Sequence, residues 1–250
     1  MKGLAILSAV FLVGFIPSAL AQTPGEPDIS FNSGSLVDNP VLSVVSAGGG
    51  KVYIGGYFTS VRGAVRNRIA RLNADGSVDK GFDPGIGAGS LVRSMALQTD
   101  GKLLIGGDFT SYNGVECRRI ARLNEDGSLD ASFDPGSAAT GAVRSVVLQA
   151  DGKVLIGGDF ISYNGLTSSY IARLNADGSP DAGFDPGNWM NGEVYSIALQ
   201  TDGKLLIGGD FSRLRNRIAR LNGDGSLDAS FDPGSGANDS IYSLVLQTDG

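Results

Sequence analysis

The residues best suited to chemistry in this 250-residue chain carry side-chain oxygens, and they recur in four short runs. The first run, Asn73–Asp79, reads NADGSVD, and similar runs follow at Asn124–Asp130, Asn175–Asp181 and Asn222–Asp228. Because Ca²⁺ takes six to eight oxygen ligands, the runs suggest calcium binding. Their spacing matches neither the EF-hand loop nor the GGxGxD repeat, and Asn, Asp and Gly also favour turns for backbone reasons. We therefore prefer a structural turn and keep calcium as the alternative.

Residues for catalysis are scarce. The chain has no histidine, which excludes Ser-His-Asp and Cys-His arrangements and His-based zinc sites. Hydrolysis by a pair of carboxylates needs two acids at a fixed separation in a cleft. Nearly every Asp falls in a repeated turn or at a repeated strand end, so no pair stands out. We expect a protein that is not an enzyme and has no cofactor, apart from the calcium alternative.

A repeated arginine predicts an ion pair in each unit. Arg71, Arg122, Arg173 and Arg220 hold the same place in four IARLN segments. We expect each to pair with a repeated acid such as Asp83, Asp134, Asp185 or Asp232. Buried pairs are weak evidence for stability, but they can fix the register of strands.

These positions recur because the whole chain is a repeat. The stretch Leu97–Phe109 reads LQTDGKLLIGGDF, and it returns at Leu148–Phe160, at Leu199–Phe211 and, more loosely, at Ser46–Phe58. The glycine pairs 55–56, 106–107, 157–158 and 208–209 are 51 residues apart, a period that indicates an array of supersecondary units. Asp-Gly dipeptides between apolar runs predict two hairpins with type I′ turns, and hence four strands, in each unit.

Four-stranded antiparallel units of this length are typical of β-propeller blades. We therefore predict an all-β, β-propeller-like array with four full repeats, from about residues 41, 92, 143 and 194, and partial repeats at both ends, the last from 241. A β-solenoid is the rival fold, although its parallel rungs suit two tight hairpins poorly. The nine Phe residues beyond position 21 occupy only two repeat positions, which favours a core role over ligand stacking.

The consecutive motifs LNxDGSLDxSFDPG and LQxDGKxLIGGDF resemble the delta-60 repeat family of bacterial exported proteins. The resemblance covers about Asp28–Gly250, nearly all of the chain beyond its N-terminal segment. It implies a β-propeller and export from the cell. It implies no catalytic or binding residues, because the function of that family is undetermined.

The N-terminal 21 residues have the pattern of a secretory signal peptide: Lys2, the apolar run Leu4–Ile16 and the small-x-small site Ala19–Ala21. We expect residues 1–21 to be removed, leaving a short linker (22–27) and a repeat domain (28–250) that is secreted or at the cell surface. No other apolar run approaches the length of a spanning helix, so we expect no membrane insertion. The last repeat stops inside a hairpin turn at Gly250, so we expect a fragment of a longer chain that carries other domains. Blade number, ring closure and oligomeric state stay open.

The formal charge of −6 argues against nucleic acid as a partner, because a duplex binder needs a basic surface. Comparison of the units shows near-constant Asp-Gly turns and variable longer loops, which we expect at the opposite end of the strands. Variation on a rigid scaffold is typical of a binding face, although loops also vary wherever packing permits. The candidate ligand-binding residues are Trp189, Met190, Tyr112, Tyr163, Arg62, Arg213 and Arg215.

We therefore expect an exported, non-catalytic binding or scaffolding module whose ligand is a protein or a glycan. The alternative is a calcium-stabilised structural array without a specific ligand, and an enzyme is the third hypothesis.

Overall fold

The computed structural model describes residues 36–213 and 215–247, and every regular element in these ranges is a β-strand. The all-β prediction is therefore confirmed. The predicted signal peptide (1–21), the linker (22–27) and residues 28–35 of the predicted repeat domain lie outside the described residues, as do 248–250. In the described part of the chain, no helix has the length and hydropathy needed to cross a membrane.

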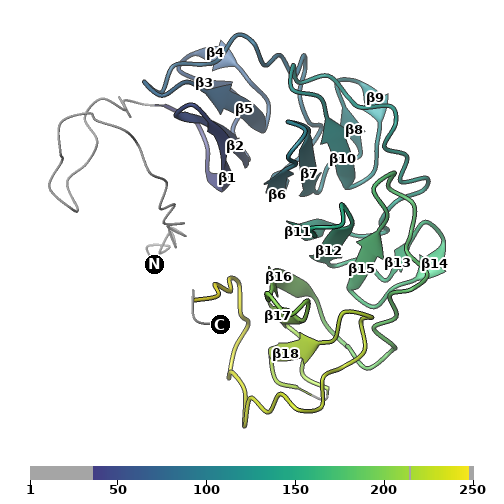
Figure 1. The fold of residues 1–250 in the computed structure, drawn as a ribbon. Helices are drawn as coiled ribbons and strands as arrows, with labels where there is room; N and C mark the ends of the chain where they lie inside the picture. Colours follow the sequence, from purple (N-terminus) through teal and green to yellow (C-terminus); the bar gives the residue numbers. More distant parts are fainter. Residues whose placement is uncertain (1–35, 214, 248–250) are drawn as a thin grey trace, which may run out of the picture.

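Each unit forms a three-stranded antiparallel sheet, and the four sheets follow one another in an arc around a common centre (Figure 1). The inner strands, nearest the centre, are β1 (Val41–Gly48), β6 (Val92–Leu97), β11 (Val143–Leu148) and β16 (Val194–Leu199). The middle strands are β2 (Lys51–Gly56), β7 (Leu103–Gly107), β12 (Val154–Gly158) and β17 (Leu205–Gly209). The third strands are β5 (Ile69–Leu72), β10 (Ile120–Leu123), β15 (Ile171–Leu174) and β18 (Ile218–Leu221).

The fourth segment of each predicted blade is reduced to one isolated bridge on the third strand. The bridges are Leu72 to Val78, Leu123 to Leu129, Leu174 to Pro180 and Leu221 to Leu227. The blade thus consists of three regular strands and a single bridge, because the chain turns toward the next unit soon after the second Asp-Gly turn.

The Asp-Gly hairpins form where we expected them, but the type I′ prediction is wrong. Gly101 has a φ of +84°, whereas Asp100 is not among the residues with positive φ. The Gly101 N–H donates to the Gln98 carbonyl (3.1 Å), and the Asp100 carboxylate accepts the Lys102 N–H (3.1 Å). The loop is therefore a type I turn closed by a left-handed glycine, in which the Asp side chain stabilises the backbone.

Type I′ turns occur instead in segments where we expected loops. Asn113 (φ +46°) and Gly114 (φ +78°) join the two short strands of a small hairpin. The Asn-Gly dipeptides at 113–114 and 164–165 are the sequence signal for these hairpins. The three hairpins are β3 (Ser60–Val61) with β4 (Ala64–Val65), β8 (Ser111–Tyr112) with β9 (Val115–Glu116), and β13 (Ser162–Tyr163) with β14 (Leu166–Thr167).

Adjacent sheets approach closely at the first glycine of each pair. A Cβ atom at Gly106 would lie 2.6 Å from a side-chain carbon of Val143 and 2.7 Å from one of Val146, both on the next inner strand. Gly157 meets Val194 in the same way, at 2.7 Å. These distances are shorter than real Cβ contacts, so only glycine lets the middle strand of one sheet reach the inner strand of the next.

The segment 241–247 docks on the fourth sheet as an inner strand would. A Cβ atom at Gly208 would lie 2.7 Å from Ile241. The Leu244 N–H donates to Ser196 Oγ (3.0 Å), which matches the bond from the Ile197 N–H to Ser145 Oγ (3.2 Å) one unit earlier. In Figure 1 this segment runs along the inner side of β16.

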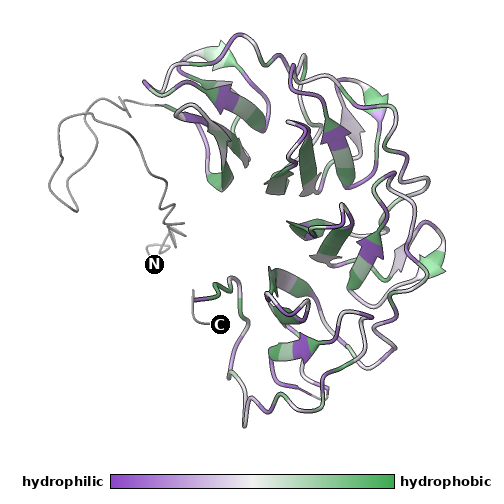
Figure 2. Ribbon diagram, in the orientation of Figure 1, coloured by the Kyte–Doolittle hydropathy of each residue, from purple (hydrophilic) through white to green (hydrophobic). Residues whose placement is uncertain are grey.

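Apolar side chains fill the space between the sheets, and in Figure 2 the green of hydrophobic residues is concentrated on the inner and middle strands. The core role predicted for the phenylalanines is confirmed for seven of them. Phe231 is half-buried, and Phe31 lies outside the described residues. The seven are Phe58, Phe82, Phe109, Phe133, Phe160, Phe184 and Phe211, each at most 8% exposed.

A buried ion cluster recurs on the third strand of each unit. Asp130 Oδ2 accepts hydrogen bonds from Arg122 Nε (2.7 Å) and Lys102 Nζ (2.9 Å). Arg122 Nη1 also donates to the Ala176 carbonyl of the next unit (2.6 Å), so the cluster joins neighbouring sheets. The equivalent pairs are Arg71 with Asp79, Arg173 with Asp181 and Arg220 with Asp228.

The ion pairs form, but the predicted acid partners, Asp83, Asp134, Asp185 and Asp232, are wrong. Asp130 is the partner of Arg122 because its N–H donates to the Arg122 carbonyl (2.9 Å), which places the two side chains next to each other. The carboxylate of Asp134 instead accepts the N–H of Gly136 (2.9 Å) in its own turn.

The ion clusters make the carboxylates strong acids. Burial would raise the pKa of Asp79, but bonds from Lys51, the Gly81 N–H and Arg71 outweigh it and lower the pKa to about 2. The bond from Lys153 is the main reason that the pKa of Asp181 falls to about 2. Such groups stabilise the fold above the pKa of the unfolded chain, near 3.9, and this contribution is lost as they are protonated.

We therefore predict that the free energy of unfolding falls between pH 4 and pH 2, because protonation of Asp79 and Asp181 in this window breaks their ion pairs. Urea denaturation at pH 6, 4, 3 and 2 measures it. The control is Asp181→Asn, which removes one titrating group and should show a smaller fall across the same window. A variant with an unreduced fall would contradict the assignment.

Candidate functional site

Two of the predicted ligand-binding residues belong to the core. Tyr112 and Tyr163 are fully buried, and their hydroxyls donate to the carbonyls of Gly127 (2.7 Å) and Gly178 (2.8 Å). Burial also raises the pKa of both hydroxyls well above the usual range. The prediction of ligand contact is therefore wrong for both, because the linker before each unit bridges the tyrosine and covers it.

The Trp189–Met190 pair is also less accessible than we expected. Met190 is 5% exposed and packs in the core between the third and fourth sheets, so the prediction of ligand contact is wrong for this residue. Trp189 is half-buried, with its ring edge-on to Phe211 at 5.8 Å between centroids.

The predicted basic residues lie on different blades. Arg62 is exposed in the small hairpin of the first unit, whereas Arg213 and Arg215 lie in the short loop of the fourth. The Arg213 N–H donates to the side chain of Asn191 (3.0 Å), and Arg215 is half-buried. Arg62 lies between β3 and β4, whereas the other two lie between β17 and β18, so two units separate them and the three arginines form no common patch.

The oxygen-rich runs use their carboxylates internally. Asp75 Oδ1 accepts the N–H (2.9 Å) and the hydroxyl (2.6 Å) of Ser77, and these bonds lower its pKa. Asp79 is bound by Arg71 and Lys51. Within residues 36–213 and 215–247, no cluster of three carboxylates or thiols has the arrangement of a metal site. The turn interpretation accounts for the geometry of each run.

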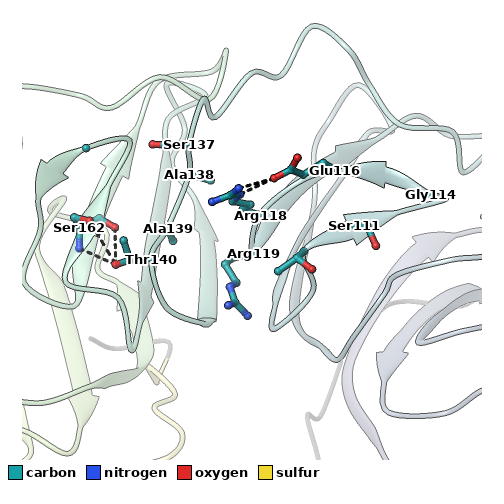
Figure 3. Close-up of a pocket in the computed structure, with 12 residues that line it drawn as sticks. Ser111, Gly114, Glu116, Arg118, Arg119, Ser137, Ala138, Ala139, Thr140 and Ser162 are labelled. Atoms are coloured by element: carbon teal, nitrogen blue, oxygen red, sulfur yellow. Dashed lines mark hydrogen bonds and ion pairs between the residues drawn. The ribbon is translucent and has the colours of Figure 1, made fainter.

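A hollow of about 710 Å³ lies between the small hairpins of the second and third units (Figure 3). At its edge Arg118 and Glu116 point toward each other and form an ion pair (2.6 Å) that is mostly exposed. Arg119 also lines the hollow, and the rest of the lining is glycine and small side chains, including Ser111, Ser137, Ala139 and Thr140. Small-molecule pockets are usually lined by apolar and aromatic groups, so this hollow is a weak candidate for such a ligand.

A stronger candidate lies at the centre of the arc, where each inner strand carries a β-bulge at its second residue. The register passes from Val92 opposite Gly107 to Ser94 opposite Gly106, so Arg93 has no residue opposite it on the neighbouring strand. The second glycine of the pair makes room for the bulge, since a Cβ atom at Gly107 would lie 1.9 Å from the Leu91 carbonyl oxygen. Bulges re-aim side chains and are frequent next to binding sites.

The bulges direct one side chain from each inner strand to a shared hollow of about 150 Å³. We call this hollow the axial mouth. It lies at the end of the array where the linkers enter the inner strands. Its lining residues are Leu42, Arg93, Arg144, Tyr195 and Tyr242.

The side chains of the axial mouth form a stacked row. The rings of Tyr195 and Tyr242 are parallel within 1°, with centroids 5.1 Å apart. The Arg144 guanidinium also lies over the Tyr195 ring, 4.9 Å from its centroid. Burial and a hydrogen bond to Glu193 raise the pKa of Tyr195, so its hydroxyl stays protonated.

Two carboxylates anchor the arginines of this row. Arg93 Nε and Nη2 donate to the two oxygens of Asp108 (2.6 and 2.7 Å). Arg144 binds Asp159 through the same two nitrogens and lies 3.3 Å from Glu193. Such bidentate pairs fix the planes of the guanidinium groups.

Sequence reasoning missed the axial mouth, although the repeats carry a signal for it. The inner strands and the last segment begin VLS, VRS, VRS, VYS and IYS, so the first and third residues hardly vary. The second residue changes from apolar to basic to aromatic. A variable position between two constant ones indicates a side chain outside the core.

Together, the arc of antiparallel sheets and the inward-facing row define a β-propeller repeat protein. The family model described as domain of unknown function (DUF5122) β-propeller matches residues 50–82, 98–133, 149–184 and 200–231, more than half of the chain. The chain therefore belongs to this family. No curated protein matches the sequence.

Solved structures show the same fold at low sequence identity. One is the extracellular domain of a putative one-component system from B. thetaiotaomicron, with 16% identity, a TM-score of 0.53, and coverage of 85% of this chain and 26% of that chain. Another is the WD40 β-propeller domain of Doa1, with 18% identity, a TM-score of 0.51, and coverage of 82% and 57%. This chain spans less than two thirds of either protein, and the likeness shows the fold alone.

Proposed function

We propose that this chain is an exported, non-catalytic binding module that holds its ligand at the linker end of the propeller array. One observation carries the proposal: the repeated frame is nearly constant, whereas the residue that faces the axial mouth changes along the array from Leu to Arg to Tyr. A scaffold role alone would not require different side chains at equivalent places on one axis.

Charge and geometry support binding over catalysis. The two arginines of the axial mouth are held by carboxylates in bidentate pairs, which leaves those carboxylates less suited to act as acid or base. The mouth instead offers flat faces and directional hydrogen-bonding groups, which recognise a ligand without altering it.

Export is supported by the signal-like pattern of residues 1–21 and by the resemblance to the delta-60 repeat proteins. In that setting the partner is a protein or a glycan outside the cytoplasm, and further domains of a longer chain would place the array on a surface.

We predict that blocking the linker end abolishes ligand binding, whereas blocking the turn end does not. The ligand is first found by screening the purified chain on glycan and peptide arrays. Thr140→Cys, exposed on a linker, and Glu125→Cys, exposed in an Asp-Gly turn, are then each labelled with a large polyethylene glycol maleimide. Cys117→Ser removes the native thiol in both, since Ser168 stands at the equivalent position.

Binding that survives the label at Thr140 but not the label at Glu125 would place the ligand at the wrong end and contradict the proposal. The absence of any ligand on either array would contradict a binding role.

A calcium-stabilised array is the alternative, and a thermal melt separates it from our proposal. We predict the same midpoint with calcium or with EDTA, because the carboxylates of each run already bind Ser, Arg and Lys. A cation at a hundred times its Kd would add about 2.7 kcal/mol and raise the midpoint by several degrees. A rise of that size with calcium would favour the alternative.

A further inference from the structure

We infer that the axial mouth is a carbohydrate-binding site that holds one uncharged sugar ring beside Tyr242, Tyr195 and Asp210. This inference rests on the proposed binding function and names its site and ligand class.

The first argument is the stacked aromatic surface. Tyr242 is 70% exposed, and one of its faces is already used by the parallel ring of Tyr195. The face of an aromatic ring carries negative charge density, which attracts the weakly positive C–H groups on one side of a sugar ring. A tyrosine also loses little side-chain freedom on binding, because it has only two χ angles.

The second argument is the compensation of charge. Arg93 is paired with Asp108, and Arg144 with Asp159, so neither pair offers a net charge to an ionic ligand. The bidentate bonds of Arg93 use two of its five N–H donors and leave others for a ligand oxygen. With the charges of these two pairs cancelled, the remaining donors and acceptors fit a ligand rich in hydroxyl groups.

The third argument is the carboxylate of Asp210, because the fourth unit lacks the arginine that binds the equivalent carboxylate in the second and third units. Asp108 and Asp159 are 23% and 26% exposed beside their arginines. In the fourth unit Tyr195 replaces the arginine, and the side chain of Asp210 is 48% exposed, with only a 3.4 Å contact to Arg217. Asp210 can therefore accept hydrogen bonds from ligand hydroxyls next to the aromatic surface, as can Glu193, which is 35% exposed.

The size of the mouth limits the ligand. At about 150 Å³ it is smaller than the roughly 300–1,000 Å³ of pockets that enclose drug-sized molecules. One sugar ring would fill it, and the rest of a glycan would extend out of the open end.

The test measures binding of methyl glycosides of glucose, galactose, mannose and N-acetylglucosamine to the full chain by saturation-transfer NMR. Binders are then titrated against Tyr242→Ala and Asp210→Asn. The control is Val115→Ala, an exposed residue (52%) in the outer hairpin β8–β9. We expect at least one glycoside to bind, with affinity reduced tenfold or more in the first two variants and unchanged in the control.

Other outcomes separate this inference from the proposed function. Glycoside binding that is unchanged in Tyr242→Ala and Asp210→Asn would overturn the axial site but keep a binding module. If none of the four glycosides binds and a peptide binds instead, only the ligand class is overturned. If that peptide is basic and its binding requires Tyr242, the axial mouth is a site for cationic ligands. Circular dichroism melts of both variants that match the wild type exclude unfolding as the cause of lost binding.

Discussion

The contact between the first glycine of each pair and the next inner strand sets the spacing of the sheets. At Gly106, Gly157 and Gly208 a hydrogen replaces a side chain, and Val143, Val194 and Ile241 fill the space. The inner strands can then lie close together around one axis. The phenylalanine core and the Arg122-type bonds to the next unit form within this spacing, because both connect groups across the same boundary.

The second glycine determines what faces the axis. Gly107 and its equivalents have no side chain, which leaves room for a bulge in the inner strand opposite them. The second residue of every inner strand is therefore unpaired in the sheet and points into the axial mouth. A frame that is nearly the same in all units thus presents Leu, Arg and Tyr side chains at one shared point. The first and third residues of each inner strand maintain the sheet, whereas the second residue lines the axial mouth. The second residue can therefore change without altering the blades.

The sequence predicted those features that depend on local pattern, and it failed where tertiary pairing decides. The period, the Asp-Gly hairpins and the phenylalanine core follow from turn chemistry and hydrophobic spacing. The acid partner of Arg122 is set by a backbone hydrogen bond from the Asp130 N–H to the Arg122 carbonyl. The sequence does not reveal this bond, so it could not distinguish Asp130 from Asp134. Tyr112 belongs to a segment expected to be a loop, and the linker reaches it through an isolated bridge from Ala88. The axial mouth depends on a register shift between the inner and middle strands. In the sequence, the only signal for it is the variable second residue that appears when the repeats are compared.

The unfolding free energy of Gly157→Ala tests the central claim most directly. A methyl group there would lie 2.7 Å from Val194, whose χ1 is stiff, so we predict a loss of about 1–3 kcal/mol in urea denaturation. Gly223→Ala is the matched control, because its Cβ would lie 3.5 Å from the nearest atom and alanine already stands at the equivalent positions 74 and 176. Equal stability of the two variants would contradict the claim that close glycine contacts between sheets hold the array together.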